Sequence, residues 1–511
     1  MKKASLLKRI ISFLMVTILI LLPTLTTFAS ASENEEYPNI FIPGIMASDI
    51  YRNVNAPEEG LAWPPSTDSI LSLVKNSIPA LLEFSITRDW DKLGHALSPL
   101  AYNLFDKVVS DADGKITNGS GVIFEYPAKE NLQNNPNSIF SYDWRADPID
   151  TAAKLNDYIN YVLEATGAEK VTIECHSLGG VVTLSYCSLY GYEKIDCIAF
   201  NTAAIYGTSF AGDLLSGDMM ISGDSLMTFM DFVADGTEQE ELLAKIFDIL
   251  ECSGLGDLVA ELGNTILENL THILLPEVVI PLFGKWLSIW AMVSDEKIDE
   301  AMEYAFTHYI DESDPEAQEL KANIENYNNL VRKNKTETLL EIDEHCKVGV
   351  ISRYGYSSIP VTSSWQKVSD GVLDSKSSSF GATFALYGAT LDDDIIANTA
   401  PEYISPDKTI DASTCLFPEK TWFIKGTKHS NGYGDLSALV KLILTADEEV
   451  TVDTFDRFPR FMKYDFDSNS IISDNGENEV KNDGIFGFFA KIKAFFADFM
   501  DKLRKFFGII K

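Results

Sequence analysis

Hydrophobic residues recur along the chain with two alternating periodicities. Short apolar runs bounded by turn residues predict buried strands. These runs are residues 39–42, 139–142, 171–173, 195–200, 348–352 and 422–426. Apolar residues at helical spacing predict helices across 150–166 and 178–189. Because strands and helices that alternate in this order are typical of a parallel sheet with crossover helices, the pattern predicts an α/β protein.

Two long stretches interrupt this alternation. Residues 51–136 separate the early strands, and we expect a lid-like insertion there. Residues 206–344 are rich in helical patterns and predict a helical cap. The apolar helical stretches of this cap are residues 242–250, 255–274 and 278–293, followed by a charged stretch at 311–335. The sheet domain is then expected in two parts, residues 32–205 and 345–464.

The end of the chain changes character twice. Residues 465–483 are polar and acidic, and they predict a flexible linker. In residues 484–511, phenylalanines and aliphatic residues recur every three or four positions with lysines between them, which predicts one amphipathic helix. An aromatic face beside basic residues suits the surface of an anionic membrane. Oligomerisation through the same stripe is the alternative.

The beginning of the chain predicts export. Basic residues among the first nine precede an apolar run at 10–22 and then Ala29-Ser30-Ala31, so residues 1–31 are expected to be a signal peptide cleaved after Ala31. An uncleaved anchor is the alternative, although the run is short for a membrane span. The protein is therefore expected to be secreted or attached to the extracellular surface. The formal net charge of −35 disfavours a nucleic-acid partner.

Six cysteines are compatible with disulfides in a secreted protein. Cys175, Cys187 and Cys197 lie within predicted strands or helices, and we interpret them as buried free thiols. The other three are Cys252, Cys346 and Cys415. Their spacing does not determine a pairing.

The segment after the third predicted strand carries the candidate nucleophile. This strand runs into Cys175-His176-Ser177-Leu178-Gly179-Gly180 and then into a predicted helix. A tight strand-to-helix turn with a serine between small residues is the nucleophile elbow of α/β-hydrolases. Cys175 replaces the usual first glycine, and its small side chain still permits the turn. We therefore expect an α/β-hydrolase fold with Ser177 as the nucleophile.

The general base is expected later in the chain, because the order in this fold is serine, then acid, then histidine. His429 follows the predicted strand at 422–426 on a loop-like segment, which is where the fold places its base. His176 adjoins the serine, but neighbours on so tight a turn point apart. We interpret His176 as a packing or hydrogen-bonding residue.

The acid is expected after the predicted strand at 348–352. Asp370-Gly371 is a turn pair in this interval that would expose its carboxylate toward His429. Asp374 is the second candidate. For the oxyanion formed by attack on an ester, we expect backbone N–H donors from Leu178 and from Ile45, which follows the turn Pro43-Gly44. This chemistry predicts no metal and no cofactor.

Several motifs occur together with this constellation. They are Phe41-Ile42-Pro43-Gly44 followed by Ser48, Tyr142-Asp143-Trp144-Arg145, the Ser177 turn, Tyr354-Gly355, Asp370-Gly371 and His429. In this combination, which covers most of residues 38–445, the chain resembles the lecithin:cholesterol acyltransferase family, which includes lysosomal phospholipase A2-type enzymes. Asp143-Trp144-Arg145 is the most family-specific element, and we expect it to support the pocket rather than to act in catalysis.

The resemblance implies hydrolysis or transfer of a fatty acyl chain of a lipid through an acyl-enzyme on Ser177, with the region around Trp63 as a membrane-facing lid. No cysteine precedes Cys175, so the disulfide that ties this lid in animal members is absent. Apolar cap residues at 255–293 suit an acyl chain, and core packing explains them equally well. A general carboxylesterase or lactone hydrolase, and a non-catalytic surface-binding protein, are the alternatives.

Overall fold

A computed structural model describes most of the chain between residues 37 and 476. The described residues are 37–220, 222, 224–225, 228, 264–265, 268–310, 313–430, 434–465, 468–474 and 476. The predicted signal peptide, the end of the predicted linker and the predicted helix at 484–511 lie outside these residues, as does the predicted helical stretch at 242–250. Among the residues described, no helix is both long and apolar enough to cross a membrane.

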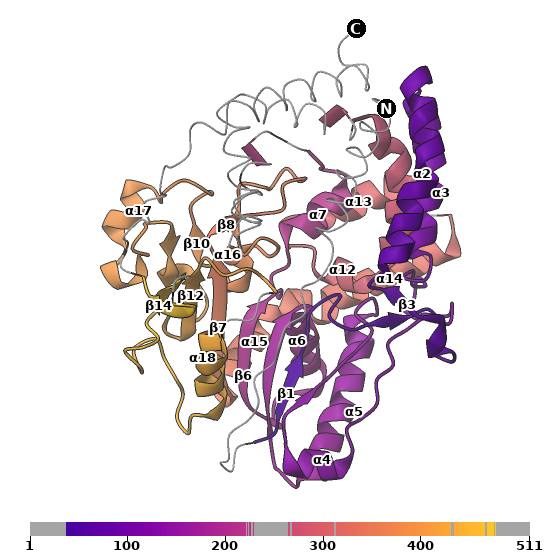
Figure 1. The fold of residues 1–511 in the computed structure, drawn as a ribbon. Coiled ribbons are helices and arrows are strands. Elements are labelled where there is room, and N and C mark those ends of the chain that lie inside the picture. The colour runs from indigo at the N-terminus through magenta and orange to yellow at the C-terminus, as the bar shows by residue number, and fades with distance from the viewer. Residues whose placement is uncertain are drawn as a thin grey trace.

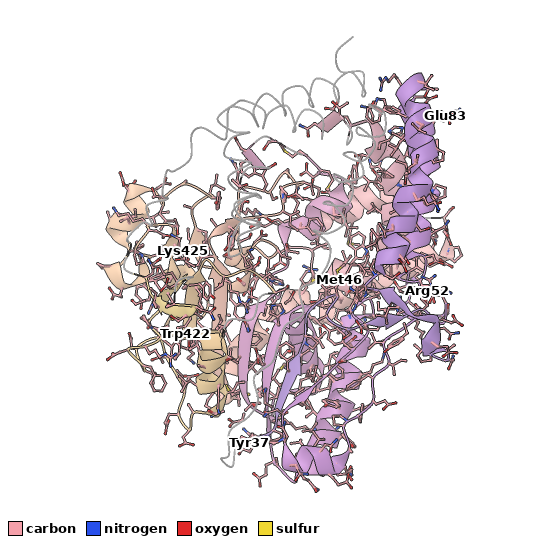
Figure 2. The ribbon with its side chains drawn as sticks, in the orientation of Figure 1. Tyr37, Met46, Arg52, Glu83, Trp422 and Lys425 are labelled. Carbon is pink, nitrogen blue, oxygen red and sulfur yellow. The ribbon has the colours of Figure 1, made fainter. Side chains whose placement is uncertain are left out.

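Within the described part of the chain, an eight-stranded sheet forms the centre of the molecule (Figure 1). In spatial order its strands are β14 (Ser470–Ser473), β13 (Phe461–Asp465), β12 (Thr421–Lys425), β7 (Lys347–Tyr354), β6 (Ile195–Ala203), β5 (Val171–Ser177), β1 (Asn39–Ile42) and β4 (Ser138–Ile139). Neighbouring strands are parallel except at the β13–β14 edge, which is antiparallel. In Figure 2, Tyr37 lies below Met46 and Trp422 below Lys425, so β1 and β12 run in the same direction. The expected α/β class is confirmed.

Helices cover both faces of this sheet. The strands alternate in the direction of their side chains: Ile198 and Phe200 of β6 belong to the core that includes α5 (Pro148–Thr166), α6 (Leu178–Tyr190) and α15 (Lys335–His345). Cys197 and Ala199 of the same strand pack with α18 (Gly434–Thr445) instead. Because both faces are buried, the strands read as the continuous apolar runs seen in the sequence.

The described part of the 51–136 insertion is a helical hairpin on a small β-ribbon. Strands β2 (Ile50–Tyr51) and β3 (Leu61–Trp63) form the ribbon, and α2 (Thr67–Thr87) and α3 (Trp90–Phe105) form the hairpin. Asp89 accepts a hydrogen bond from the backbone of Lys92 at the start of α3, which makes it the N-cap of that helix. In Figure 2, Glu83 near the far end of α2 lies well away from Arg52 at its base. The hairpin therefore projects from the sheet domain (Figure 1).

The described part of residues 206–344 is helical, as expected. Its helices are α7 (Ser209–Ser216), a π-helical turn (Leu275–Val279), α11 (Ile280–Phe283), α12 (Leu287–Ala291), α13 (Ile298–His308), α14 (Pro315–Leu330) and α15. The helix expected over 278–293 is interrupted at Gly284, whose carbonyl accepts a hydrogen bond from the indole of Trp290 at 2.8 Å. The indole of Trp286 donates to the carbonyl of Val108 at 2.9 Å. The two tryptophan side chains therefore anchor the segment where the helix is interrupted.

Several boundaries differ from those expected. Strands β13 and β14 pair from Met462 opposite Ser473 to Asp465 opposite Ser470. The sheet therefore extends to Ser473, and a linker would begin after it rather than at residue 465. The strand expected over 139–142 is limited to β4, and the hydroxyl of Tyr142 beyond it donates to the carbonyl of Pro43. The remaining elements are α4 (Lys129–Asn134), β8 (Tyr356–Ser357), β9 (Val368–Ser369), α16 (Ser375–Ser378), β10 (Thr383–Phe384), α17 (Asp393–Asn398) and β11 (Ile410–Asp411).

The cysteines within the described residues are free and buried. They are Cys175, Cys187, Cys197, Cys346 and Cys415. Burial raises the pKa of the Cys346 thiol to about 11, which keeps it protonated at neutral pH. The interpretation of the first three as core thiols is confirmed, whereas Cys252 lies outside the described residues.

Candidate active site

Ser177 occupies a strained turn at the carboxyl end of β5. Its backbone has φ 55° and ψ −123°, a conformation that few non-glycine residues adopt, and α6 begins at the next residue. A Cβ added at Gly179 would lie 2.1 Å from the carbonyl oxygen of Ile42, and one added at Gly180 would lie 2.4 Å from Cβ of Ala203. Both positions therefore require glycine. Cys175, at the first position of the motif, is fully buried and fits the turn.

His429 and Asp370 are brought together at the same edge of the sheet. Nδ1 of His429 lies 2.7 Å from Oδ2 of Asp370, and both side chains are almost fully buried. The backbone N–H of His429 also donates to the carbonyl oxygen of Asp370 at 3.0 Å. Because Nδ1 carries the proton of this bond, Nε2 is the basic nitrogen of a neutral His429.

The carboxylate of Asp370 accepts further hydrogen bonds. Oδ2 accepts from the hydroxyl of Thr202 at 2.7 Å, and Oδ1 accepts from the backbone N–H groups of Val372 at 3.1 Å and Leu373 at 2.8 Å. Burial opposes ionisation, but the charge of His429 and these hydrogen bonds outweigh it and hold the pKa of Asp370 below its usual value. Asp370 is therefore an ionised and fully oriented partner for His429.

Asp374, the second candidate for the acid, has a different partner. Its Oδ2 accepts from the backbone N–H of Ser209 at 2.8 Å and from the hydroxyl of Ser209 at 2.6 Å. Burial raises the pKa of Asp374. The carboxylate thus joins the 370–374 loop to the start of α7, and of the two aspartates it is Asp370 that contacts His429.

The turn after β1 lies directly against the serine. A Cβ added at Gly44 would fall 2.7 Å from Cβ and 3.2 Å from Oγ of Ser177, so only glycine allows this approach. The hydroxyl of Tyr142 donates to the carbonyl of Pro43 at 2.7 Å and fixes the turn from behind. Met46, which ends the turn, lies at the centre of Figure 2, above the sheet. Ile45, one of the two expected oxyanion donors, is therefore part of a turn that contacts Ser177. The other expected donor, Leu178, directly follows Ser177 in the chain.

Asp143, Trp144 and Arg145 lie at the base of the insertion. Arg145 is fully buried; its Nε and Nη2 donate to Asp143 at 2.8 and 2.6 Å, and its Nη1 donates to the carbonyl of Lys107 at 2.9 Å. The indole of Trp144 donates to the carbonyl of Ser48 at 2.9 Å. Arg145 and Trp144 thus tie residues 107 and 48 to this segment through their backbone carbonyls, and support of a pocket by this element stays a prediction.

Thr202 was not anticipated from the sequence. It lies near the end of β6 and has a φ of 48°, which is unusual for a β-branched residue. Its position beside the expected end of a strand was the available signal, since neighbouring strand ends meet at one edge of a parallel sheet. Arg353, near the end of β7, was not anticipated either, although its Nη1 donates to the carbonyl of His429 at 2.8 Å.

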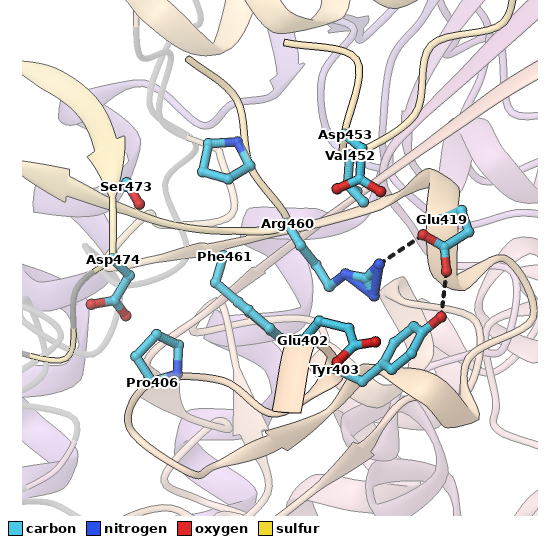
Figure 3. Close-up of a pocket in the computed structure, with 11 residues that line it drawn as sticks. Glu402, Tyr403, Pro406, Glu419, Val452, Asp453, Arg460, Phe461, Ser473 and Asp474 are labelled. Atoms are coloured by element: carbon cyan, nitrogen blue, oxygen red, sulfur yellow. Dashed lines mark hydrogen bonds and ion pairs between the residues drawn. The ribbon is translucent and has the colours of Figure 1, made fainter. Parts of the chain in front are cut away.

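A pocket of about 460 Å³ lies elsewhere in the molecule (Figure 3). Arg460 and Phe461 border it at the amino end of β13. Ser177, by contrast, is the last residue of β5, at the carboxyl ends of the parallel strands. None of the predicted site residues lines it. Figure 3 shows Glu419 bridging Arg460 at 2.8 Å and the hydroxyl of Tyr403 at 2.5 Å. These contacts tie together the loops at this edge of the sheet.

Comparisons with known proteins leave the family open. No family model matches the chain, and no curated protein matches it. One solved structure to which the chain is similar is described as "The crystal structure of Tle4-Tli4 complex", with 18% sequence identity and a TM-score of 0.19. The alignment covers 36% of this chain and 48% of that chain, so this chain spans about half its length. A TM-score this low identifies neither a shared fold nor a shared activity.

Proposed function

We propose that the protein is a serine hydrolase of the α/β-hydrolase class that acts on acyl esters through Ser177. The observation that carries this proposal is the pairing of His429 with Asp370 at 2.7 Å, on loops of the same parallel sheet in which β5 ends in the strained Ser177 turn. The order Ser177, Asp370, His429 is that of the class. A non-catalytic protein would have no need to maintain a backbone strain of about 1–3 kcal/mol at Ser177.

The first half of the reaction forms an acyl-enzyme. Oγ of Ser177 attacks the ester carbonyl carbon while Nε2 of His429 takes its proton, and the ionised Asp370 stabilises the imidazolium. The N–H groups of Leu178 and Ile45 stabilise the oxyanion of the tetrahedral intermediate. When the bond to the alcohol oxygen breaks, His429 returns the proton to that oxygen, and the alcohol leaves.

The second half repeats these steps with another nucleophile. Water, or the hydroxyl of an acceptor alcohol, gives its proton to Nε2 of His429 as it attacks the acyl carbon. The bond to Ser177 Oγ breaks, and Oγ recovers the proton from His429. Water yields a fatty acid and an alcohol acceptor yields a new ester, so the same site serves hydrolysis or O-acyl transfer.

We further propose lipid acyl esters as the substrate class, in line with the resemblance to the lecithin:cholesterol acyltransferase family. The insertion adds support, because Leu71, Leu82 and Ile86 of α2 are 48%, 48% and 84% exposed. Spacings of eleven and four residues return to nearly the same helical direction, so these side chains share one face of α2 with the exposed Lys75 among them. Such a face suits contact with a lipid surface.

The cap gives less support than expected. Its described apolar residues pack into the main core; Trp286, for example, meets the ring of Trp144 edge-on with ring centroids 5.0 Å apart. Core packing accounts for these residues without an acyl chain. Secretion and membrane contact through residues 484–511 remain parts of the proposal that concern residues outside the described ranges.

A fluorophosphonate probe tests the catalytic proposal. We expect wild-type protein to be labelled on Ser177 and Ser177→Ala to be unlabelled, while Ser188→Ala, which removes another serine from α6, labels at the wild-type rate. Wild-type protein that stays unlabelled and hydrolyses no ester would refute catalysis and favour a surface-binding protein. Activity on soluble short-chain esters without activity on lipid vesicles would favour a general carboxylesterase.

A further inference from the structure

Three groups hold the backbone of His429. This residue lies on the connection between β12 and α18, where no regular secondary structure fixes it. Its N–H donates to the carbonyl of Asp370, and its own carbonyl oxygen accepts from Nε2 of His176 at 2.9 Å and from Nη1 of Arg353 at 2.8 Å. The backbone of His429 is therefore held through both peptide groups that flank its Cα.

Arg353 connects this loop to the sheet. Its Nη1 also donates to the carbonyl of Lys428 at 2.6 Å, and its Nη2 donates to Oδ1 of Asn201 at 3.2 Å. The amide of Asn201 donates in turn to Oε1 of Glu174 at 3.2 Å. Arg353 is 3% exposed; burial raises the pKa of Glu174 on β5, and the charge of Arg353 opposes that rise. The planar, multidentate guanidinium suits this role better than a lysine would.

His176 connects the same loop to the turn after β1. A Cβ added at Gly44 would lie 3.2 Å from Nδ1 of His176, so the imidazole packs against this turn while Nε2 reaches the carbonyl of His429. Burial, the neighbouring His429 and the charge of Arg353 lower the pKa of His176 well below its usual value. The ring is neutral at pH 7, and its one proton is on Nε2, where it meets a carbonyl acceptor.

We propose that His176 and Arg353 are positioning residues for His429: together they fix its backbone carbonyl, and His176 also links the base to the Gly44 turn beside Ser177. This inference rests on the proposed function, since it concerns the base of that reaction. A neutral His176 beside the base has a second consequence, because it adds no positive charge when His429 becomes an imidazolium 4.7 Å away, measured between ring centroids.

Two substitutions at position 176 separate hydrogen bonding from packing. His176→Phe keeps a planar ring and removes the donor, whereas His176→Gln keeps an N–H donor at a similar distance from the backbone. Since a misplacement of about 1 Å costs about 100-fold in rate, we expect His176→Phe to lower kcat for a soluble short-chain ester by about 10- to 100-fold, with KM changed less than about threefold. His176→Gln should recover most of kcat, and the exposed control His345→Phe should match wild type.

Arg353→Lys is the matched variant on the other side of the loop. It keeps the charge opposite Glu174 but cannot reach two carbonyls and Asn201 together, so we expect a loss of kcat similar to that of His176→Phe. Thermal unfolding of each variant is the control that tests whether it is folded. Equal kcat in wild type, His176→Phe and Arg353→Lys would overturn the proposal.

A proton NMR measurement keeps this test independent of turnover. The His429–Asp370 hydrogen bond is expected to give a downfield resonance that disappears in His429→Ala. We expect this resonance to broaden or shift in His176→Phe and to remain in His176→Gln. An inactive wild-type protein with this pattern would refute the proposed function and leave the positioning role standing. An unchanged resonance in His176→Phe would refute the positioning role, whatever the activity.

Discussion

The hydroxyl of Thr202 and Nδ1 of His429 bond to the same oxygen of Asp370, each at 2.7 Å. The threonine thereby orients the carboxylate that holds the imidazole of His429. Replacing Thr202 with valine preserves its shape and leaves Asp370 Oδ2 with one donor fewer. We expect kcat to fall about tenfold, because a hydrogen bond to a charged group contributes about 1.5–3 kcal/mol, while KM stays close to wild type. Steady-state kinetics test this, with Thr202→Ser as the variant that restores the donor.

Substitution of the two aspartates of the 370–374 loop should affect turnover very differently. Asp370→Asn removes the charge beside His429 and favours the wrong tautomer, so we expect kcat to fall by about 10⁴-fold. Asp374→Asn keeps an acceptor for Ser209 and should retain most turnover. The measurement is the rate of ester hydrolysis per folded molecule, and the opposite ranking of the two variants would reassign the acid.

Gly44 offers a test of the turn beside the serine. A methyl group there would lie 2.7 Å from Cβ of Ser177, so Gly44→Ala must displace either the turn or the serine. We expect fluorophosphonate labelling to slow by at least about tenfold, because the position of Ser177 Oγ and of the oxyanion donors relative to the reacting phosphorus changes. Gly121→Ala is the control, since its backbone is not in the left-handed region and the nearest atom to an added Cβ is Cγ1 of the Val54 side chain at 3.1 Å. Similar labelling rates in both variants would show that Gly44 does not need to approach Ser177 so closely.

The pH dependence of stability should carry a contribution from Asp147. Burial raises the pKa of this carboxyl from 3.8 to about 6 in the folded protein. The folded state therefore holds the proton more tightly than the unfolded state, and this contribution to stability is complete below about pH 4 and lost as the pH rises through 6. An asparagine side chain at this position would still cap α5 but would not ionise.

We expect Asp147→Asn to be more favourable relative to wild type at pH 7 than at pH 4.5, by about 2 kcal/mol. Urea unfolding at both pH values measures this difference. Asp89→Asn makes the same change at the exposed N-cap of α3. The prediction fails if the two variants show the same dependence on pH.

The exposed face of α2 leads to a prediction about lipid surfaces. Changing both Leu82 and Ile86 to glutamate should reduce hydrolysis of vesicle-bound lipid several-fold and leave hydrolysis of a soluble ester unchanged, since neither residue is buried. Vesicle co-sedimentation and the two activity assays check this. Glu83→Gln on the same helix is a control that leaves the apolar face intact. Unchanged activity on vesicles would remove α2 from the lipid-contacting surface.

Much of the sheet was predictable because its strands are buried on both faces. β1, β5, β6, β7 and β12 read as apolar runs, and Ser177 was recognisable from the strand, turn and helix around it. The edge hairpin of β13 and β14 was missed, since an edge strand such as Ser470–Ser473 exposes one side and reads as polar. Local pattern thus identifies central strands better than edge strands.

The candidate site was predictable only in part. Asp370 and Asp374 lie in one loop, and only the turn pair Asp370-Gly371 favoured Asp370 in the sequence; in the folded chain Ser209 binds Asp374 and His429 binds Asp370. Thr202 and Arg353 look like any polar residue near a strand end. Their importance comes from contacts with residues more than 70 positions away, which a sequence pattern does not encode.

The Tyr142–Arg145 segment anchors both the turn beside Ser177 and the chain that returns from the insertion. Tyr142 holds the turn beside Ser177, and Arg145 holds the return of the insertion at Lys107, so the anchor is complete within four residues of chain. The hairpin formed by α2 and α3 lies outside this anchor. Its helix α3 packs on the cap instead, where a Cβ added at Gly94 would lie 2.6 Å from Ile273. Grafted hairpins that keep this face of α3 and change only the exposed face of α2 should therefore alter the surfaces that the protein contacts without disturbing the Ser177 turn.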